Sequence, residues 1–286
     1  MMNDLLRRLE FREFSYEEDP ESVVDMQRCR EILDGGWLDS AETCRMNHKM
    51  VVRTPGSSWV LAFGKTIFAY ADMVPAGDGT GCVITWRLHP DFRNPIVARK
   101  LLDGLTQQAR LRNYSGLVFL ADGEEMLTDL ERIGLKRDRS YGWVQPADLD
   151  PGPMAESQPV SLTLDEVMGE ALLPFLGPPL PPRFVLVRSF MAASYGVFHH
   201  ARPALYRLRV QGVEYLACFD GREWFVFRKA RHELDREAIR PILLTLASLH
   251  PGRILLSKKA AEAADLPFQN DTPLWDLFHP TCTPSS

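Results

Sequence analysis

The stretch Gly81-Cys82-Val83-Ile84-Thr85-Trp86-Arg87-Leu88-His89-Pro90-Asp91-Phe92-Arg93-Asn94-Pro95 decides the fold. Its first eight residues are rich in β-branched and aromatic side chains, which favours a strand that ends before His89-Pro90-Asp91. From Ile96 onward, apolar residues recur at three- and four-residue steps, the spacing of one helix face. Asn94 suits the N-cap of this helix, and Pro95 suits its first turn. The stretch therefore predicts a strand, a tight loop and a long helix.

Two further segments continue this pattern. Leu117-Val118-Phe119-Leu120-Ala121 is a short apolar run, typical of a strand covered on both faces. A second amphipathic helix follows and ends at Gly134. Its apolar positions are Met126, Leu127, Leu130 and Ile133. Two parallel strands joined through a helix N-terminus form a general device for holding a phosphate.

The segment from Leu88 to Leu102 resembles the pyrophosphate loop of GCN5-related N-acetyltransferases (GNATs). In that family, a strand ending in His-Pro-Asp is followed by Arg or Gln, two variable residues, Gly, one more residue, and Gly or Ala. Arg93 and Ala98 stand at the first and last of these positions. Ile96 replaces the central Gly, and Pro95 removes one backbone donor. The match is therefore partial.

The resemblance extends over about 11–146 and implies an α/β fold, with a mixed, mostly antiparallel sheet flanked by helices. It implies acetyl-CoA as co-substrate, with its thioester held where the motif strand and the next strand diverge. A substrate amine would attack the thioester carbonyl, which backbone N–H groups near Leu88 would polarise. The residues that the resemblance places at the cofactor are Arg87, Leu88, Arg93, Asn94, Ile96, Val97, Ala98 and Arg99.

The usual proton-transfer residues of the family are absent. Leu130 stands where many members have a Tyr that protonates the leaving thiolate, and Ile84 and Thr85 stand near the usual Glu base. Tyr141 is the one phenol near the predicted closing strands that could donate a proton. Tyr70 is a second candidate for the acceptor cleft. For both tyrosines a packed position in the core is the alternative.

The remaining pattern predicts two copies of this fold. In the first copy we expect a strand near Phe11, helices over 17–33 and 40–50, a hairpin around Gly64 and closing strands within 136–144. We expect domains at 1–146 and 160–286, joined by a linker at 147–159 that is rich in Pro and acidic residues.

The second half follows the same order, with helices over 162–176 and 184–198 and a closing strand over 274–278. Its loop between Phe227 and Asp235 contains no Gly, which a bound pyrophosphate would require for close backbone approach. We therefore expect a degenerate copy that binds no CoA.

Composition narrows the class of protein. The chain has 286 residues and a formal net charge of −5, which disfavours nucleic acid as a partner. The five cysteines are scattered, which predicts reduced thiols, a cytoplasmic location and no metal site. No apolar run approaches the length of a membrane span, and no signal peptide is recognisable.

Two functions remain open, beside a small-molecule pocket without CoA in which Ile96 or Pro95 would fill the pyrophosphate seat. The first is acetyl transfer to an amine of a small molecule or peptide. The alternative is a catalytically inactive GNAT-fold module that binds a ligand or another protein. In the alternative, association of the two halves of the chain would bury their free sheet edges. A homodimer is a further expectation.

Overall fold

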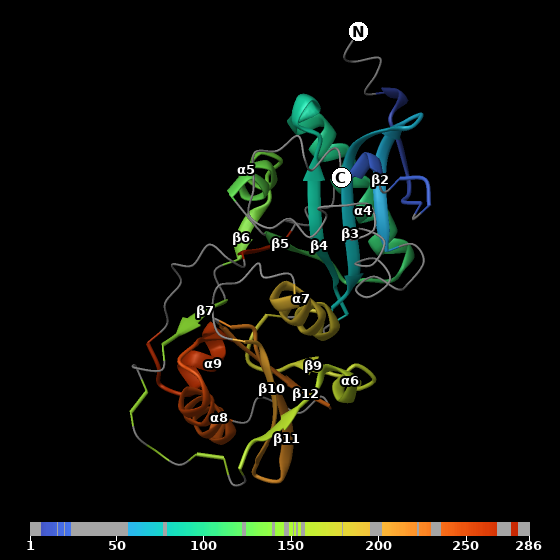
Figure 1. Ribbon diagram of the computed structural model, residues 1–286. Helices are drawn as coiled ribbons and strands as arrows, with labels where there is room; N and C mark the ends of the chain where they lie inside the picture. The colour runs from blue at the N-terminus through green and yellow to red at the C-terminus, as the bar shows by residue number, and fades with distance from the viewer. Residues whose placement is uncertain are drawn as a thin grey trace. The chain divides into compact units, whose positions relative to one another are not determined.

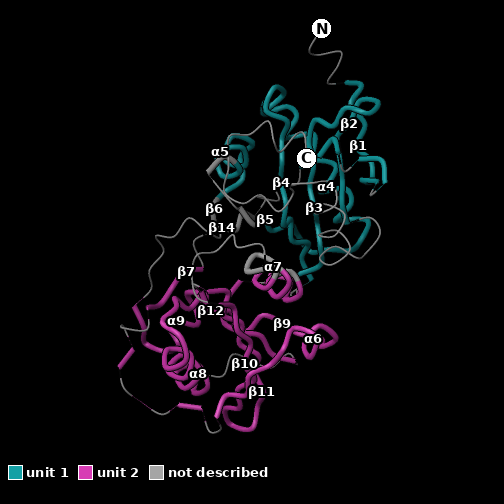
Figure 2. The backbone as a smooth tube through the Cα atoms, viewed as in Figure 1, with its two compact units in different colours: residues 1–138, 273–286 teal, residues 139–272 magenta. Residues whose placement is uncertain are grey.

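The computed structural model describes residues 7–23, 57–138, 141–267 and 276–279, apart from 16, 20, 77–78, 122–123, 146–148, 151, 153, 156–157, 179, 195–201, 222 and 230–235. The chain forms two compact units (Figure 2). The first unit contains residues 1–138 and 273–286, and the second contains residues 139–272.

The first unit is built on a seven-stranded sheet of order β1-β2-β3-β4-β5-β14-β6. The strands are β1 (Glu10–Glu13), β2 (Ser58–Phe63), β3 (Thr66–Pro75), β4 (Gly81–Leu88), β5 (Leu117–Ala121), β6 (Lys136–Asp138) and β14 (Asp276–His279). Neighbouring strands are antiparallel except β4 and β5, which run parallel. The predicted hairpin is confirmed, with Gly64 at a φ of 59° between β2 and β3.

Two helices of the first unit follow the predicted order (Figure 1). A short 3-10 turn, η2 (Pro90–Phe92), leads from β4 to α4 (Pro95–Leu111), and α5 (Glu124–Arg132) follows β5. The inner face of α4 packs on β2, β3 and β4 through Val97, Leu101 and Leu105, which are fully buried. The strand, loop, helix and strand predicted from Gly81 onward are therefore confirmed.

The second unit repeats this order around a sheet whose main path is β7-β13-β12-β11-β10-β8. Its strands are β7 (Tyr141–Val144), β8 (Val160–Leu162), β9 (Leu173–Pro174), β10 (Ala204–Val210), β11 (Val213–Phe219), β12 (Glu223–Arg228) and β13 (Arg253–Ser257). Its helices are α6 (Leu164–Val167), α7 (Pro182–Ser194), α8 (Arg236–Leu249) and α9 (Lys258–Ala263). Three antiparallel strands, a helix, a parallel strand and a helix thus occur in both units. The expected tandem is confirmed.

The last strands of the two halves are exchanged, which corrects the expected closing strands. β6 closes the first sheet, but β7 pairs with β13 of the second unit, from Tyr141↔Ser257 to Val144↔Ile254. β14, expected to close the second sheet, lies between β5 and β6 of the first unit. The chain therefore does not divide at 147–159. That segment lies within the second unit, where the Ala155 N–H donates to the Thr245 hydroxyl at 2.8 Å.

Other predictions have mixed outcomes. The helix expected over 162–176 is wrong, because α6 ends at Val167 and β9 follows within the predicted range. The helix expected over 40–50 lies outside the described residues, as does most of the helix expected over 17–33.

Candidate functional site

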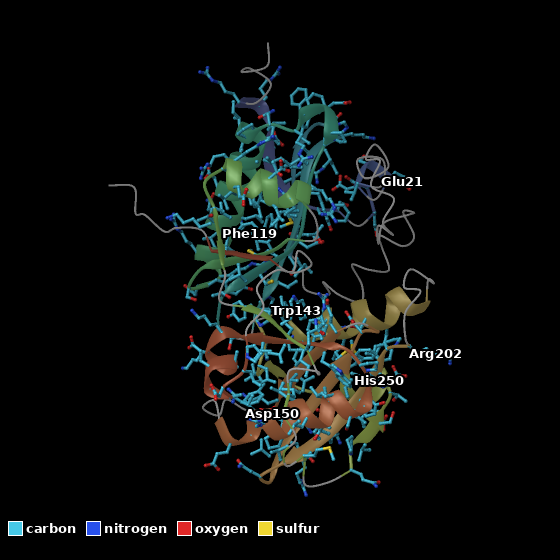
Figure 3. The ribbon with its side chains drawn as sticks, turned by 90° about the vertical axis from the view of Figure 1, so that its left-hand side faces the viewer. Glu21, Phe119, Trp143, Asp150, Arg202 and His250 are labelled. Atoms are coloured by element: carbon cyan, nitrogen blue, oxygen red, sulfur yellow. The ribbon has the colours of Figure 1, made fainter. Side chains whose placement is uncertain are left out.

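The motif strand and its parallel neighbour diverge after a short paired region. β4 and β5 pair only at Gly81↔Leu117, Cys82↔Val118 and Val83↔Phe119, although β4 continues to Leu88. We call this divergence the first splay. Phe119, labelled in Figure 3, is the last residue of β5 that pairs with β4.

A β-bulge in β4 marks the start of the first splay. Asp72 of β3 pairs with Thr85, whereas the next residue, Met73, pairs with Val83, so Ile84 is the extra residue. A bulge of this kind bends its strand and turns the following backbone groups. The bulge and the loss of pairing with β5 therefore coincide.

The N-terminus of α4 is capped by its own chain. The Asn94 side-chain oxygen accepts from the N–H groups of Ile96 and Val97 at 2.9 and 3.0 Å. The Ala98 N–H donates to the Asn94 carbonyl at 3.2 Å, and Pro95 has no N–H. A phosphate could take the Ile96 and Val97 donors only by displacing the Asn94 side chain.

The basic residues of the motif have partners on other elements. Arg93 donates through Nε to Asp129 of α5 at 2.8 Å, and the Asp129 side chain is only 4% exposed. Arg99 donates to the Ile133 carbonyl after α5, and Lys100 donates to the Leu9 carbonyl at 2.6 Å. These contacts tie the motif to α5 and to the start of the chain.

The other predicted cofactor residues differ in how exposed they are. Ile96 is 55% exposed at the start of α4, whereas Leu88, Val97 and Ala98 are buried in the core, so only their backbone could meet a ligand. Arg87 is partly buried and donates to the Trp86 carbonyl at 2.9 Å.

Trp86 places a buried donor beside the first splay. Its ring meets the Phe119 ring edge-on, with centroids 5.7 Å apart, and thereby links β4 to β5. The Trp86 Nε1 atom is buried and has no hydrogen-bond partner among the described residues. A buried donor of this kind costs roughly 1–3 kcal/mol unless an acceptor reaches it.

A buried carboxylate that the sequence analysis missed lies next to the bulge. Asp72, opposite Thr85, accepts at one oxygen from both Ser58 Oγ and Tyr70 Oη, each at 2.6 Å. All three residues are buried, and we call them the Asp72 trio. The available signal was the i, i+2 spacing of Tyr70 and Asp72, which puts both side chains on one face of a strand.

The usual acid and base positions hold apolar or small side chains. Leu130 is fully buried in the core against α4, and Ile84 is 5% exposed. Tyr141 lies on β7, in the sheet of the second unit and not in the sheet that carries the motif, and its role as proton donor stays a prediction. Tyr70 is likewise a core residue, 1% exposed, although its hydroxyl reaches Asp72.

The described residues contain neither a metal-binding cluster nor a membrane-spanning helix. In the described part of the chain, no three His, Cys, Asp or Glu side chains gather closely enough to hold a metal ion. Nor does any described helix combine the length and apolar character that crossing a membrane requires.

Comparison with known proteins places the fold. No protein-family model matches the sequence, and no curated protein matches it significantly. Among solved structures, a GCN5-related N-acetyltransferase from Anabaena variabilis is similar, with a TM-score of 0.56 and 12% identity over 94% of this chain and 72% of that chain. One from Kribbella flavida has a TM-score of 0.52 and 14% identity over 94% and 71%. These likenesses show that the chain has the fold of the GCN5-related N-acetyltransferases.

Proposed function

We propose that this protein is an acyl-CoA-dependent N-acyltransferase that holds acetyl-CoA in the first splay and transfers its acetyl group to an amine. The observation that carries the proposal is the divergence of β4 from β5 at the bulge, directly before the loop to α4. Where two strands stop pairing, their backbone N–H and C=O groups can hydrogen-bond to a ligand instead. The pantetheine arm of CoA contains amide bonds that suit such hydrogen bonds. The buried Trp86 N–H, without an acceptor among the described residues, supports a ligand at this place.

In the proposed reaction, the amine nitrogen attacks the thioester carbonyl carbon and the carbon–sulfur bond breaks. One proton must leave the nitrogen, and the CoA thiolate takes one up. We assign removal of the proton to Asp72, acting through the hydroxyl of Tyr70 or Ser58. Its place opposite Thr85, beside the bulge, supports this assignment. General acid–base help of this kind is typically worth roughly 10²–10⁴ in rate.

A second candidate is a GNAT-fold module that binds a ligand or a protein without catalysis. Two observations favour it. Asn94 already occupies the donors that a pyrophosphate would use, and a buried Leu130 fills the position of the usual acid. The two candidates differ in turnover, because only an enzyme releases CoA.

Turnover is tested with acetyl-CoA and a panel of primary amines, comprising small amines, lysine-containing peptides and peptides with free N-termini. Release of the CoA thiol is followed with a chromogenic thiol reagent. We expect release above the protein-free rate with at least one amine class. Binding of acetyl-CoA without release for every amine would favour the module, and absence of both would contradict both candidates. The acceptor, the cytoplasmic location and a homodimer stay predictions.

A further inference from the structure

The second unit has its own divergent pair of strands. β12 and β13 correspond in order to β4 and β5, and their parallel pairing ends at Trp224↔Ile254. β12 continues to Arg228, and β13 continues to Ser257. We call this divergence the second splay.

A segment of the same unit lies within the second splay. Residues 173–177, which we call the plug, begin with β9, and β9 pairs antiparallel with the end of β12 (Figure 1). The N–H of Phe175 donates to the Val226 carbonyl of β12 at 2.9 Å. On the other side, the N–H of Ser257 in β13 donates to the Leu176 carbonyl at 2.6 Å. The plug thus bonds to both strands.

The two central side chains of the plug are part of the core of the second unit. Phe175 is 7% exposed and Leu176 is fully buried. The Phe175 ring lies 4.8 Å from the Tyr215 ring and beneath the Arg228 guanidinium, which is 5.1 Å from its centroid. A Cβ built on Gly177 would lie 3.4 Å from the Leu255 carbonyl, so the backbone of the plug runs close to β13. Phe175 and Leu176 are thus packed in the interior, whereas Leu173, Pro174 and Gly177 are partly exposed.

Ion pairs fix the position of a residue that precedes the plug. Glu170, shortly before β9, pairs with Arg207 of β10 at 2.6 Å and with Lys229 at 3.4 Å. Lys229 directly follows β12, so Glu170 links the start of the plug to the end of the strand beside it. These two ion pairs therefore tie the residue before the plug to β10 and to the end of β12.

We propose that the plug takes the place of an acyl-CoA in the second splay, so that the second unit binds no cofactor and the chain has one acyl-CoA site. The inference rests on the proposed function for the location of that one site. The absence of Gly from the loop after β12 is the sequence reason to expect no CoA in the second unit. The plug adds a structural reason, because the backbone groups that a pantetheine arm would need are bonded to the plug.

The test is hydrogen–deuterium exchange of the full chain, with and without 1 mM acetyl-CoA. The amides of Phe175 and Ser257 should exchange at least about 100-fold more slowly than an open chain, and acetyl-CoA should leave both unchanged. Fast exchange of either amide in the free protein, or loss of plug protection when acetyl-CoA is added, would overturn the proposal. Peptides over 84–98 report separately on the first splay, so an absence of ligand effects there contradicts the proposed function and leaves the plug result standing.

A variant pair makes the test specific. Phe175→Ala removes the ring that anchors the plug and should speed exchange at Ser257 by at least about tenfold. Val160→Ala, at an exposed position on β8 of the same unit, serves as the control and should leave Ser257 unchanged. Equal exchange at Ser257 in Phe175→Ala and in the parent protein would show that the plug does not hold β13.

Discussion

At the scale of single residues, Asn94 holds the two backbone donors that a phosphate bound at α4 would need. Its side chain occupies the Ile96 and Val97 donors, and a cap of this kind is worth about 1 kcal/mol. Asn94→Gly removes the competing oxygen at little cost to the helix and should tighten acetyl-CoA binding by about fivefold in calorimetry.

The matched variant for this test is Asn94→Asp. It keeps the cap and adds a negative charge beside the phosphate, so binding should weaken strongly. Weaker binding in Asn94→Gly than in the parent would contradict the account, since it would make the Asn94 side chain a contact of the cofactor.

A substitution at Asp72 can test its proposed catalytic role without removing its hydrogen bonds. Asp72→Asn keeps an oxygen that can accept from Ser58 and Tyr70 but cannot take up a proton. We expect the rate of CoA release to fall by roughly 10²–10⁴ while acetyl-CoA affinity is unchanged. Tyr70→Phe is the comparison, because it removes one donor to Asp72 and tests the relay. A parent-like rate in Asp72→Asn would leave the trio with a purely structural role.

Cys218 gives a test of the core of the second unit. Burial raises the pKa of the Cys218 thiol to about 12, although the Ser189 hydroxyl within reach acts in the opposite direction. Because the thiolate is the reactive form, peptides carrying Cys218 should resist iodoacetamide at pH 8 in the native protein and react in urea. Buried Cys82 should behave in the same way. Labelling of Cys218 in the folded state would contradict the packing described.

At the scale of elements, local sequence predicts the motif region closely. The bounds of β4 and β5 agree with the predicted strands, and Asn94 and Pro95 start α4 as expected, because propensity, capping and periodicity all act within a few residues. The prediction of a helix over 162–176 is wrong, because Gly169 and Pro174 are poor helix formers and β9, within this range, pairs with β12 instead.

The partners of an element are less predictable than its type. β7 and β14 have ordinary strand patterns, and nothing in those patterns says which sheet each strand joins. The same limit applies to the site. The caps were predictable from Asn94 and Pro95, whereas the Asp72 trio depends on pairing β2 with β3, and the partners of Arg93 and Arg99 depend on where α5 packs.

At the scale of the whole molecule, the exchanged strands make the two halves of the sequence depend on each other. β14 is the only strand that joins β5 to β6 in the described sheet. A chain ending at residue 272 should therefore lose the first unit's cooperative unfolding transition in urea, because β5 gains an open edge and β6 loses its partner.

The matched control ends at residue 279 and keeps β14. It should unfold like the full chain. If the chain ending at residue 272 were as stable as this control, the exchange of strands would contribute nothing to the first unit.

The central claim is one acyl-CoA site per chain, in the first splay. Calorimetric titration of acetyl-CoA into the full chain tests it most directly, with Arg93→Ala as the comparison because Arg93 orients the loop before α4 through Asp129. We predict binding in the micromolar range with one acetyl-CoA per chain, weakened several-fold in Arg93→Ala. Two acetyl-CoA molecules per chain, or no binding at millimolar concentration, would contradict the account.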